Sequence, residues 1–129
     1  MIIYFGCKGT LIDGEGHLRR YGDFVLKQLT QQGHRLFLLN TDKDDGAVAN
    51  LKRLSLLDYF EDIISGDHLE VTPDFIIDAN PEHFQADTHG YQLPYYNHYA
   101  MMDDEELLEA YRQIQRIEGR PGPPPRTDV

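Results

Sequence analysis

MIIYFGCKGTLIDGEG (residues 1–16) joins an apolar run to a polar, glycine-rich turn. Residues 1–5 have the short, continuous apolar pattern of a buried β-strand, which we expect to stop at Gly6. Residues 8–18 are expected to form a turn and a small hairpin with Asp-Gly-Glu-Gly, residues 13–16, at its tip. Functional groups are often found where a buried strand ends in this way, so this turn is a candidate site.

Strand-like and helix-like segments alternate along the chain as far as residue 117. HRLFLLNT at 34–41 and PDFIID at 73–78 are typical of two further buried strands. Apolar residues at helical spacing predict helices over 21–32 and 102–117. The remaining expected elements are a helix over 44–57, at most a short helix over 81–85, and short strands over 62–65 and 91–94.

Strands that alternate with helices of this length predict an α/β domain over residues 1–118. We expect a parallel, Rossmann-like sheet with right-handed crossovers and helices on both faces, which makes three layers. The tail GRPGPPPRTDV, residues 119–129, is too rich in proline and glycine for a helix or an inner strand. It is expected to be flexible or extended, and a ligand for a proline-recognition module is the alternative interpretation.

The composition restricts the partners and the compartment. The formal net charge is -10 and the basic residues are scattered, so we expect no nucleic-acid partner. No apolar stretch approaches the roughly 18 residues of a membrane span, and the N-terminus lacks the pattern of a signal peptide. The single cysteine, Cys7, cannot form an intramolecular disulfide. We therefore expect an acidic cytoplasmic protein without a membrane partner.

Polar residues follow three of the expected strands, at 6–10, 40–42 and 78–80. In a parallel sheet, ligands bind at the carboxyl ends of the strands, where these three segments should converge. The candidate site residues are Gly6, Lys8, Gly9, Thr10, Asn40, Thr41 and Asp78.

The order and spacing of these strand ends resemble the haloacid dehalogenase-like phosphohydrolases. The first motif of that family is an apolar strand followed by D-x-D-G-T-L, and this chain has GCKGTL at 6–11. The second is an apolar strand ending in Thr or Ser, often followed by Asn, and LFLLNT at 36–41 has these two residues in reversed order. The fourth is an apolar strand ending in acids, and FIIDAN stands at 75–80. The resemblance covers roughly residues 1–117 and implies the same fold, without the family's cap domain because no insert is long enough.

The resemblance also implies a phosphatase site whose catalytic groups are missing. In the family the first Asp of the first motif attacks phosphorus and the second protonates the leaving group, but Gly6 and Lys8 stand here. No lysine follows Arg53, so the lysine of the third motif has no convincing equivalent. Asp78 alone remains of the acidic Mg²⁺ ligands, and one carboxylate makes a poor Mg²⁺ site. We expect no intact catalytic residue and no cofactor, and we expect Lys8 to pair with Asp78.

Several of these residues have a structural interpretation beside the functional one. The amides of Gly9 and Thr10 suit an anion cradle, but a tight turn is the favoured interpretation. Asn40 and Thr41 suit hydrogen bonds to an anion, but a cap for the next helix is favoured. Cys7 is expected to be a buried, inert thiol. The histidines show no metal-ligand spacing and are expected to be scattered over the surface at positions 17, 34, 68, 83, 89 and 98.

The segment Tyr91–Met102 carries many tyrosines and methionines, which are common at protein interfaces. The favoured interpretation is that this segment wraps the sheet edge and packs against the last helix. An interface with a partner protein or, most simply, with a second copy of the chain in a homodimer is the alternative. The leading functional interpretation is a degenerate enzyme that binds a protein or an anionic ligand. The alternatives are a weak or non-standard Mg²⁺-dependent phosphatase, new chemistry around Lys8 and Cys7, and a structural subunit.

Overall fold

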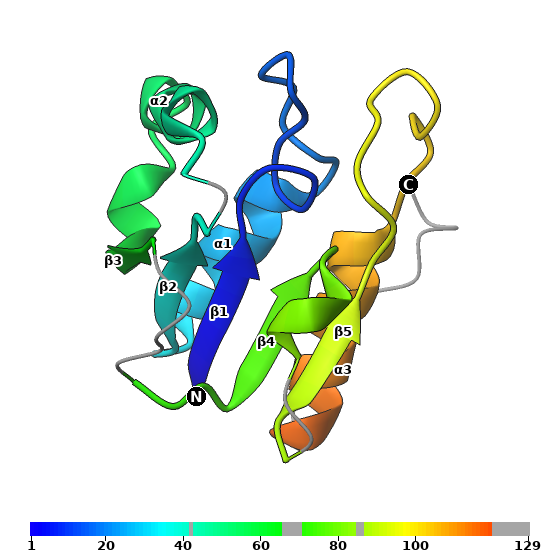
Figure 1. Ribbon diagram of the computed structural model, residues 1–129. Helices are drawn as coiled ribbons and strands as arrows, with labels where there is room; N and C mark the ends of the chain where they lie inside the picture. The colour runs from blue at the N-terminus through cyan, green and yellow to red at the C-terminus, as the bar shows by residue number, and fades with distance from the viewer. Residues whose placement is uncertain (42, 66–70, 85–86, 120–129) are drawn as a thin grey trace.

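A five-stranded parallel sheet forms the centre of the molecule, as the sequence predicts (Figure 1). The computed structural model describes residues 1–41, 43–65, 71–84 and 87–119. Each pair of neighbouring strands is parallel, in the Rossmann-like order β3-β2-β1-β4-β5. The strands are β1 Ile2–Gly6, β2 Arg35–Leu39, β3 Phe60–Ile64, β4 Phe75–Asp78 and β5 His89–Gln92.

The α-helices of the described residues are α1 Gly22–Gln31, α2 Asp45–Arg53 and α3 Glu106–Ile117, and two short 3-10 helices are η1 Leu57–Tyr59 and η2 Pro81–His83. The predicted helix over 44–57 is too long, because Ser55 takes a left-handed φ of 62° after α2 has ended. The predicted helix over 102–117 begins only at Glu106. The predicted strand over 91–94 lies two residues earlier, as β5.

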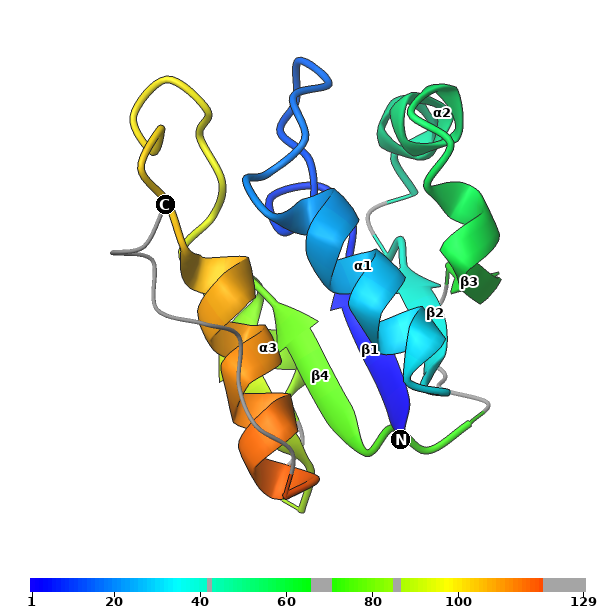
Figure 2. The same cartoon turned by 180° about the vertical axis from the view of Figure 1, so that it is seen from behind.

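One face of the sheet carries the main core, which α1 and α3 cover (Figure 2). Buried apolar side chains of both helices and of α2 join those of β1, β2 and β4 in one cluster. The opposite face carries a smaller cluster of Tyr4, Phe37, Leu39 and Ile76, against which Val71 and Phe84 pack. Among the described residues, no α-helix packs on this second face. The α-helices that the structure describes therefore cover one face of the sheet, whereas helices were predicted on both. The described parts of the β3–β4 and β4–β5 connections contain no helix longer than η2.

The segment between β1 and α1 forms the predicted turn and hairpin. Single bridges join Lys8 to Ile12 and Ile12 to Leu18, and the Asp13 N–H donates to the His17 carbonyl over 3.1 Å. This hairpin is too small to be a cap domain, in agreement with the expectation of a capless domain. Of the tail predicted at 119–129, all but Gly119 lies outside the described residues. No helix in the described part of the chain is long and apolar enough to cross a membrane.

Candidate functional site

A pocket of about 330 Å³ lies where the sequence predicts a site, at the carboxyl ends of β1, β2 and β4. The loops after β1 and β5 rise beside each other at this edge, at the top of Figure 1. Four of the predicted site residues line the pocket, while Gly9, Thr10 and Asn40 stand outside its lining. The lining residues are Gly6, Cys7, Lys8, Leu39, Thr41, Asp78, Ala79, Asn80, His83 and Tyr95.

Asp78 at the end of β4 is the centre of the site and is only 4% exposed. Its Oδ1 accepts hydrogen bonds from Thr10 Oγ1 at 3.0 Å and from the Asn80 N–H at 3.3 Å. Its Oδ2 is bonded to His83 Nδ1. Thr10 Oγ1 accepts in turn from the Ala79 N–H at 2.9 Å, which ties the first turn to the end of β4. Asp78 is therefore fixed by neighbours on both of its oxygens.

Gly6 is a steric requirement of this arrangement. A Cβ atom at position 6 would stand 2.2 Å from Asp78 Oδ1 and 2.6 Å from Thr10 Oγ1, far inside van der Waals contact. The Asp78 carboxylate thus occupies the space in which a side chain at position 6 would begin. A carboxylate side chain at position 6 would therefore require Asp78 and Thr10 to move.

The predicted ion pair between Lys8 and Asp78 is wrong. Lys8 Nζ lies 3.1 Å from Asp44 Oδ2, while the Asp78 oxygens are taken by other donors. The hydrogen bond from Lys8, aided by the Ala47 N–H, lowers the pKa of Asp44, so this carboxyl stays ionised. Asp44 is also the N-cap of α2, since its side chain accepts from the Ala47 N–H at 3.1 Å. The lysine therefore contacts the N-cap residue of α2.

In the turn after β1, the backbone N–H groups donate to carbonyl groups of the same turn. The Gly9 N–H donates to the Ile12 carbonyl over 2.7 Å, and the Thr10 N–H donates to the Cys7 carbonyl over 3.2 Å. Gly9 has a φ of 85°, and a Cβ there would stand 2.2 Å from the Tyr95 ring. These contacts support the interpretation of a tight turn over that of an anion cradle, because both amides already have acceptors.

Asn40 and Thr41 do not cap α2, so that favoured interpretation is wrong, and Asp44 takes the role. Asn40 is buried, its carbonyl accepts from the Lys43 N–H, and its Oδ1 has no hydrogen-bond partner among the described residues. Thr41 Oγ1 lies 2.9 Å from His83 Nε2 inside the pocket. Thr41 therefore lies in the lining of the pocket.

His83 is a site residue that the sequence analysis missed. It ends η2, whose N-cap Asn80 accepts from the Glu82 N–H at 3.0 Å and so turns the chain back over β4. The ring then bridges Asp78 and Thr41. The sequence offered only a weak indication of this role, because His83 simply follows Asp78, the acid at the end of a predicted strand, by five positions, with Pro81 between them.

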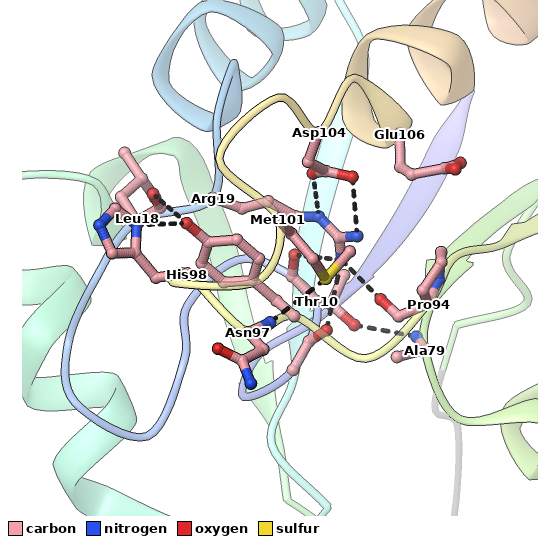
Figure 3. A network of polar contacts seen from close by, with 12 residues as sticks. Thr10, Leu18, Arg19, Ala79, Pro94, Asn97, His98, Met101, Asp104 and Glu106 are labelled. Carbon is pink, nitrogen blue, oxygen red and sulfur yellow. Dashed lines mark hydrogen bonds and ion pairs between the residues drawn. The ribbon is translucent and has the colours of Figure 1, made fainter.

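Arg19 is the second residue that was missed, and it anchors the aromatic segment (Figure 3). The side chain is fully buried, with Nε 2.6 Å from Asp104 Oδ2. One terminal nitrogen donates to the Pro94 carbonyl at 2.9 Å, and the guanidinium lies 5.2 Å from the centre of the Tyr96 ring. The Tyr96 N–H donates to the Gly9 carbonyl over 2.7 Å, so this anchor also positions the first turn.

Some side chains of the segment Tyr91–Met102 pack against the domain, and others are exposed to solvent. Tyr96 is buried, and the Tyr91 hydroxyl donates to the Glu106 carboxylate of α3, which agrees with the packing interpretation. Burial and Glu106 raise the pKa of Tyr91, so its hydroxyl stays protonated as the donor. Tyr95, Tyr99 and Met102 are instead 60%, 68% and 67% exposed. These three side chains are large apolar groups on a segment that Arg19 holds in place.

The remaining predictions concern the other histidines and the cysteine, of which His68 lies outside the described residues. His34 is buried against the N-terminal amine and His83 lies in the pocket, so scattering over the surface is wrong for both. His17 stacks on His98 with ring centres 4.2 Å apart and bonds to Asp13 at 2.9 Å. Cys7 is buried, as predicted. Within the described residues no three His, Cys, Asp or Glu side chains are grouped to hold a metal ion.

Three comparisons with known proteins gave no match: no family model, no curated protein and no solved structure matches this chain.

Proposed function

We propose that this chain is a ligand-binding protein with a haloacid dehalogenase-like fold that has lost phosphoryl transfer. The observation that carries the proposal is the Asp78 carboxylate, which fills the space next to Gly6 where the family's nucleophile would begin. The strand order and the position of the pocket are compatible with this ancestry. A carboxylate nucleophile is needed for the aspartyl-phosphate route, and position 6 has neither the group nor the space for it.

The residues at this site do not fit Mg²⁺. The ion prefers octahedral oxygen ligands and is usually bound through one or two carboxylates. Asp78 is the one carboxylate among the described lining residues, and its oxygens already accept from Thr10, Asn80 and His83. Asp44, which pairs with Lys8, is engaged by that lysine and by the α2 amide. A Mg²⁺-dependent phosphatase, the alternative function, would require most of these contacts to be replaced.

The ligand that suits the pocket best is a small anion. Lys8 is the one lysine or arginine among the described lining residues, and its side chain is 34% exposed. In a chain with a net charge of -10, an anion needs such a local cation to bind. His83 and Thr41 add polar groups to the same wall.

The test is binding of inorganic phosphate and of acetate, followed by amide chemical shifts in NMR titrations. We expect shifts confined to the pocket that saturate and that weaken in Lys8→Ala but persist in Lys27→Ala, a matched lysine on the exposed side of α1. Unsaturable shifts spread over the surface, equal in both variants, would contradict the proposal.

A second candidate function, binding of a protein partner, is favoured by the exposed side chains of Tyr95, Tyr99 and Met102. Exposed aromatic and methionine side chains on a rigid scaffold are typical of interfaces, since little conformational entropy is lost on binding. A second copy of the chain is the simplest partner. Sedimentation equilibrium tests this: Tyr99→Ser should weaken a dimer, whereas Ile117→Ser, an exposed control at the far end of α3, should not.

A further inference from the structure

Thr41, His83 and Asp78 form a continuous chain of hydrogen bonds along the pocket wall. His83 Nε2 lies 2.9 Å from Thr41 Oγ1, and His83 Nδ1 is bonded to Asp78 Oδ2. The three residues come from three places in the fold: the loop after β2, the 3-10 helix η2 and the end of β4. The parallel sheet brings them together because the carboxyl ends of its strands share one edge.

The hydrogen bonds favour one tautomer of the neutral imidazole. An ionised carboxylate only accepts, so Asp78 requires a proton on His83 Nδ1. In the neutral ring Nε2 then carries a lone pair, and the Thr41 hydroxyl donates to it. This is the tautomer that a general base needs: an acceptor nitrogen on the side of the nucleophile and an orienting acid behind it.

We call Thr41, His83 and Asp78 the relay. The burial of these three side chains suits transfer of a proton from Thr41 to His83. Asp78 is 4% exposed and is held by the Thr10 hydroxyl and the Asn80 amide, so it cannot turn away. The His83 side chain is 21% exposed, and both His83 and Thr41 line the pocket of about 330 Å³. Lys8 lines the same pocket, where its Nζ lies 3.1 Å from Asp44 Oδ2.

We propose that Thr41 is a nucleophile activated by His83 and Asp78, and that the pocket hydrolyses small carboxylic esters. The inference rests on the proposed function, since the same pocket must first bind the ligand. Phosphoryl transfer through position 6 is not involved, so loss of the old chemistry and presence of this relay are compatible.

The reaction is balanced without a metal or a redox partner. Thr41 Oγ bonds to the carbonyl carbon while its proton passes to His83 Nε2, and the ester C–O bond breaks as that proton reaches the leaving alkoxide. Water then attacks the acyl-Thr41 ester, giving its proton to His83, which returns it to Thr41 Oγ. The products are one alcohol and one carboxylic acid.

The competing explanation is purely structural, with the same bonds serving only to anchor η2 against β2. The experiment follows hydrolysis of p-nitrophenyl acetate by the purified full-length chain. Thr41→Ala and His83→Gln should each lower kcat/KM by about 100-fold or more, whereas Thr41→Ser, which keeps a hydroxyl, should remain within about tenfold of the parent.

Matched controls separate the relay from general effects. Thr30→Ala changes an exposed threonine of α1, and His89→Gln changes an exposed histidine at the start of β5, so both should leave the rate unchanged. An acetyl adduct should be found on Thr41 after acid quenching. Circular dichroism shows whether each variant is folded. If Thr41→Ala is not, the acetyl adduct at position 41 of the parent and of the Thr41→Ser variant decides the result.

The outcomes distinguish the two proposals. A rate that Thr41→Ala and His83→Gln leave unchanged, or no turnover by the parent chain, overturns the relay. If acetate still binds at Lys8 in the NMR titration, the proposed binding function stands without it. If neither acetate nor phosphate binds and no turnover occurs, both proposals fail.

Discussion

Replacing Gly6 by alanine tests the close packing of Asp78 and Thr10 against position 6 most simply. The added Cβ would stand 2.2 Å from Asp78 Oδ1 and 2.6 Å from Thr10 Oγ1, so at least one of these side chains must move. Moving Asp78 breaks its 3.0 Å hydrogen bond from Thr10 in a buried place. A hydrogen bond to a charged group contributes about 1.5–3 kcal/mol, and overpacking costs about 1–3 kcal/mol. We expect Gly6→Ala to lower the free energy of unfolding by about 2.5–6 kcal/mol.

The assay is urea unfolding followed by far-ultraviolet circular dichroism. Gly14→Ala is the matched control, since a Cβ there meets only Lys8 Cε at an ordinary 3.6 Å, and its effect should stay within about 0.5 kcal/mol. In an Asp78→Ala background most of the overlap disappears, so the added cost of Gly6→Ala should fall by at least about 1 kcal/mol. Equal costs in the two backgrounds, or a Gly6→Ala chain as stable as its parent, would refute this reasoning.

Three further predictions concern the contacts around the site. Arg19→Ala should lower the free energy of unfolding by about 3–5 kcal/mol in the same urea assay, because it leaves the Asp104 carboxylate buried without its partner. Burial alone would raise the pKa of Asp13, but hydrogen bonds from His17 and from the Glu15 N–H together lower it. The ionised Asp13 carboxylate therefore stabilises the folded protein at any pH above its unfolded pKa, and this contribution is lost as the pH falls through the folded pKa. Parent and Asp13→Ala stabilities should therefore converge below about pH 4. Lys8→Ala should raise the pKa of Asp44, measured by carboxyl NMR titration, with a change in stability below about 1 kcal/mol.

The arrangement of the elements could be predicted because it depends on local patterns. The apolar runs that form β1, β2 and β4 are short and uninterrupted, and the helices between them show regular spacing. The ends of these strands also predict that Gly6, Thr41 and Asp78 meet at one edge of the sheet. Helix ends were less accurate, since the left-handed residue Ser55, which follows α2, is set by tertiary context.

The contacts within the site could not be predicted, because they result from competition between side chains. Lys8 pairs with Asp44 since Thr10, Asn80 and His83 already occupy Asp78. Neither His83 nor Arg19 belongs to a sequence motif. Each acquires its role only where the folded chain brings distant segments together: η2 over β4 for the histidine, and Pro94 and Asp104 around the hairpin arginine.

The central proposal is that this protein does not transfer phosphoryl groups, and one measurement tests it most directly. The purified chain is assayed for hydrolysis of p-nitrophenyl phosphate with and without Mg²⁺, beside a Gly6→Asp, Lys8→Asp variant. We predict no Mg²⁺-dependent turnover by the parent, and none by the variant, because Asp78 and Thr10 stand where the side chain introduced at position 6 would begin. Mg²⁺-dependent turnover by the parent that survives repurification would contradict the account.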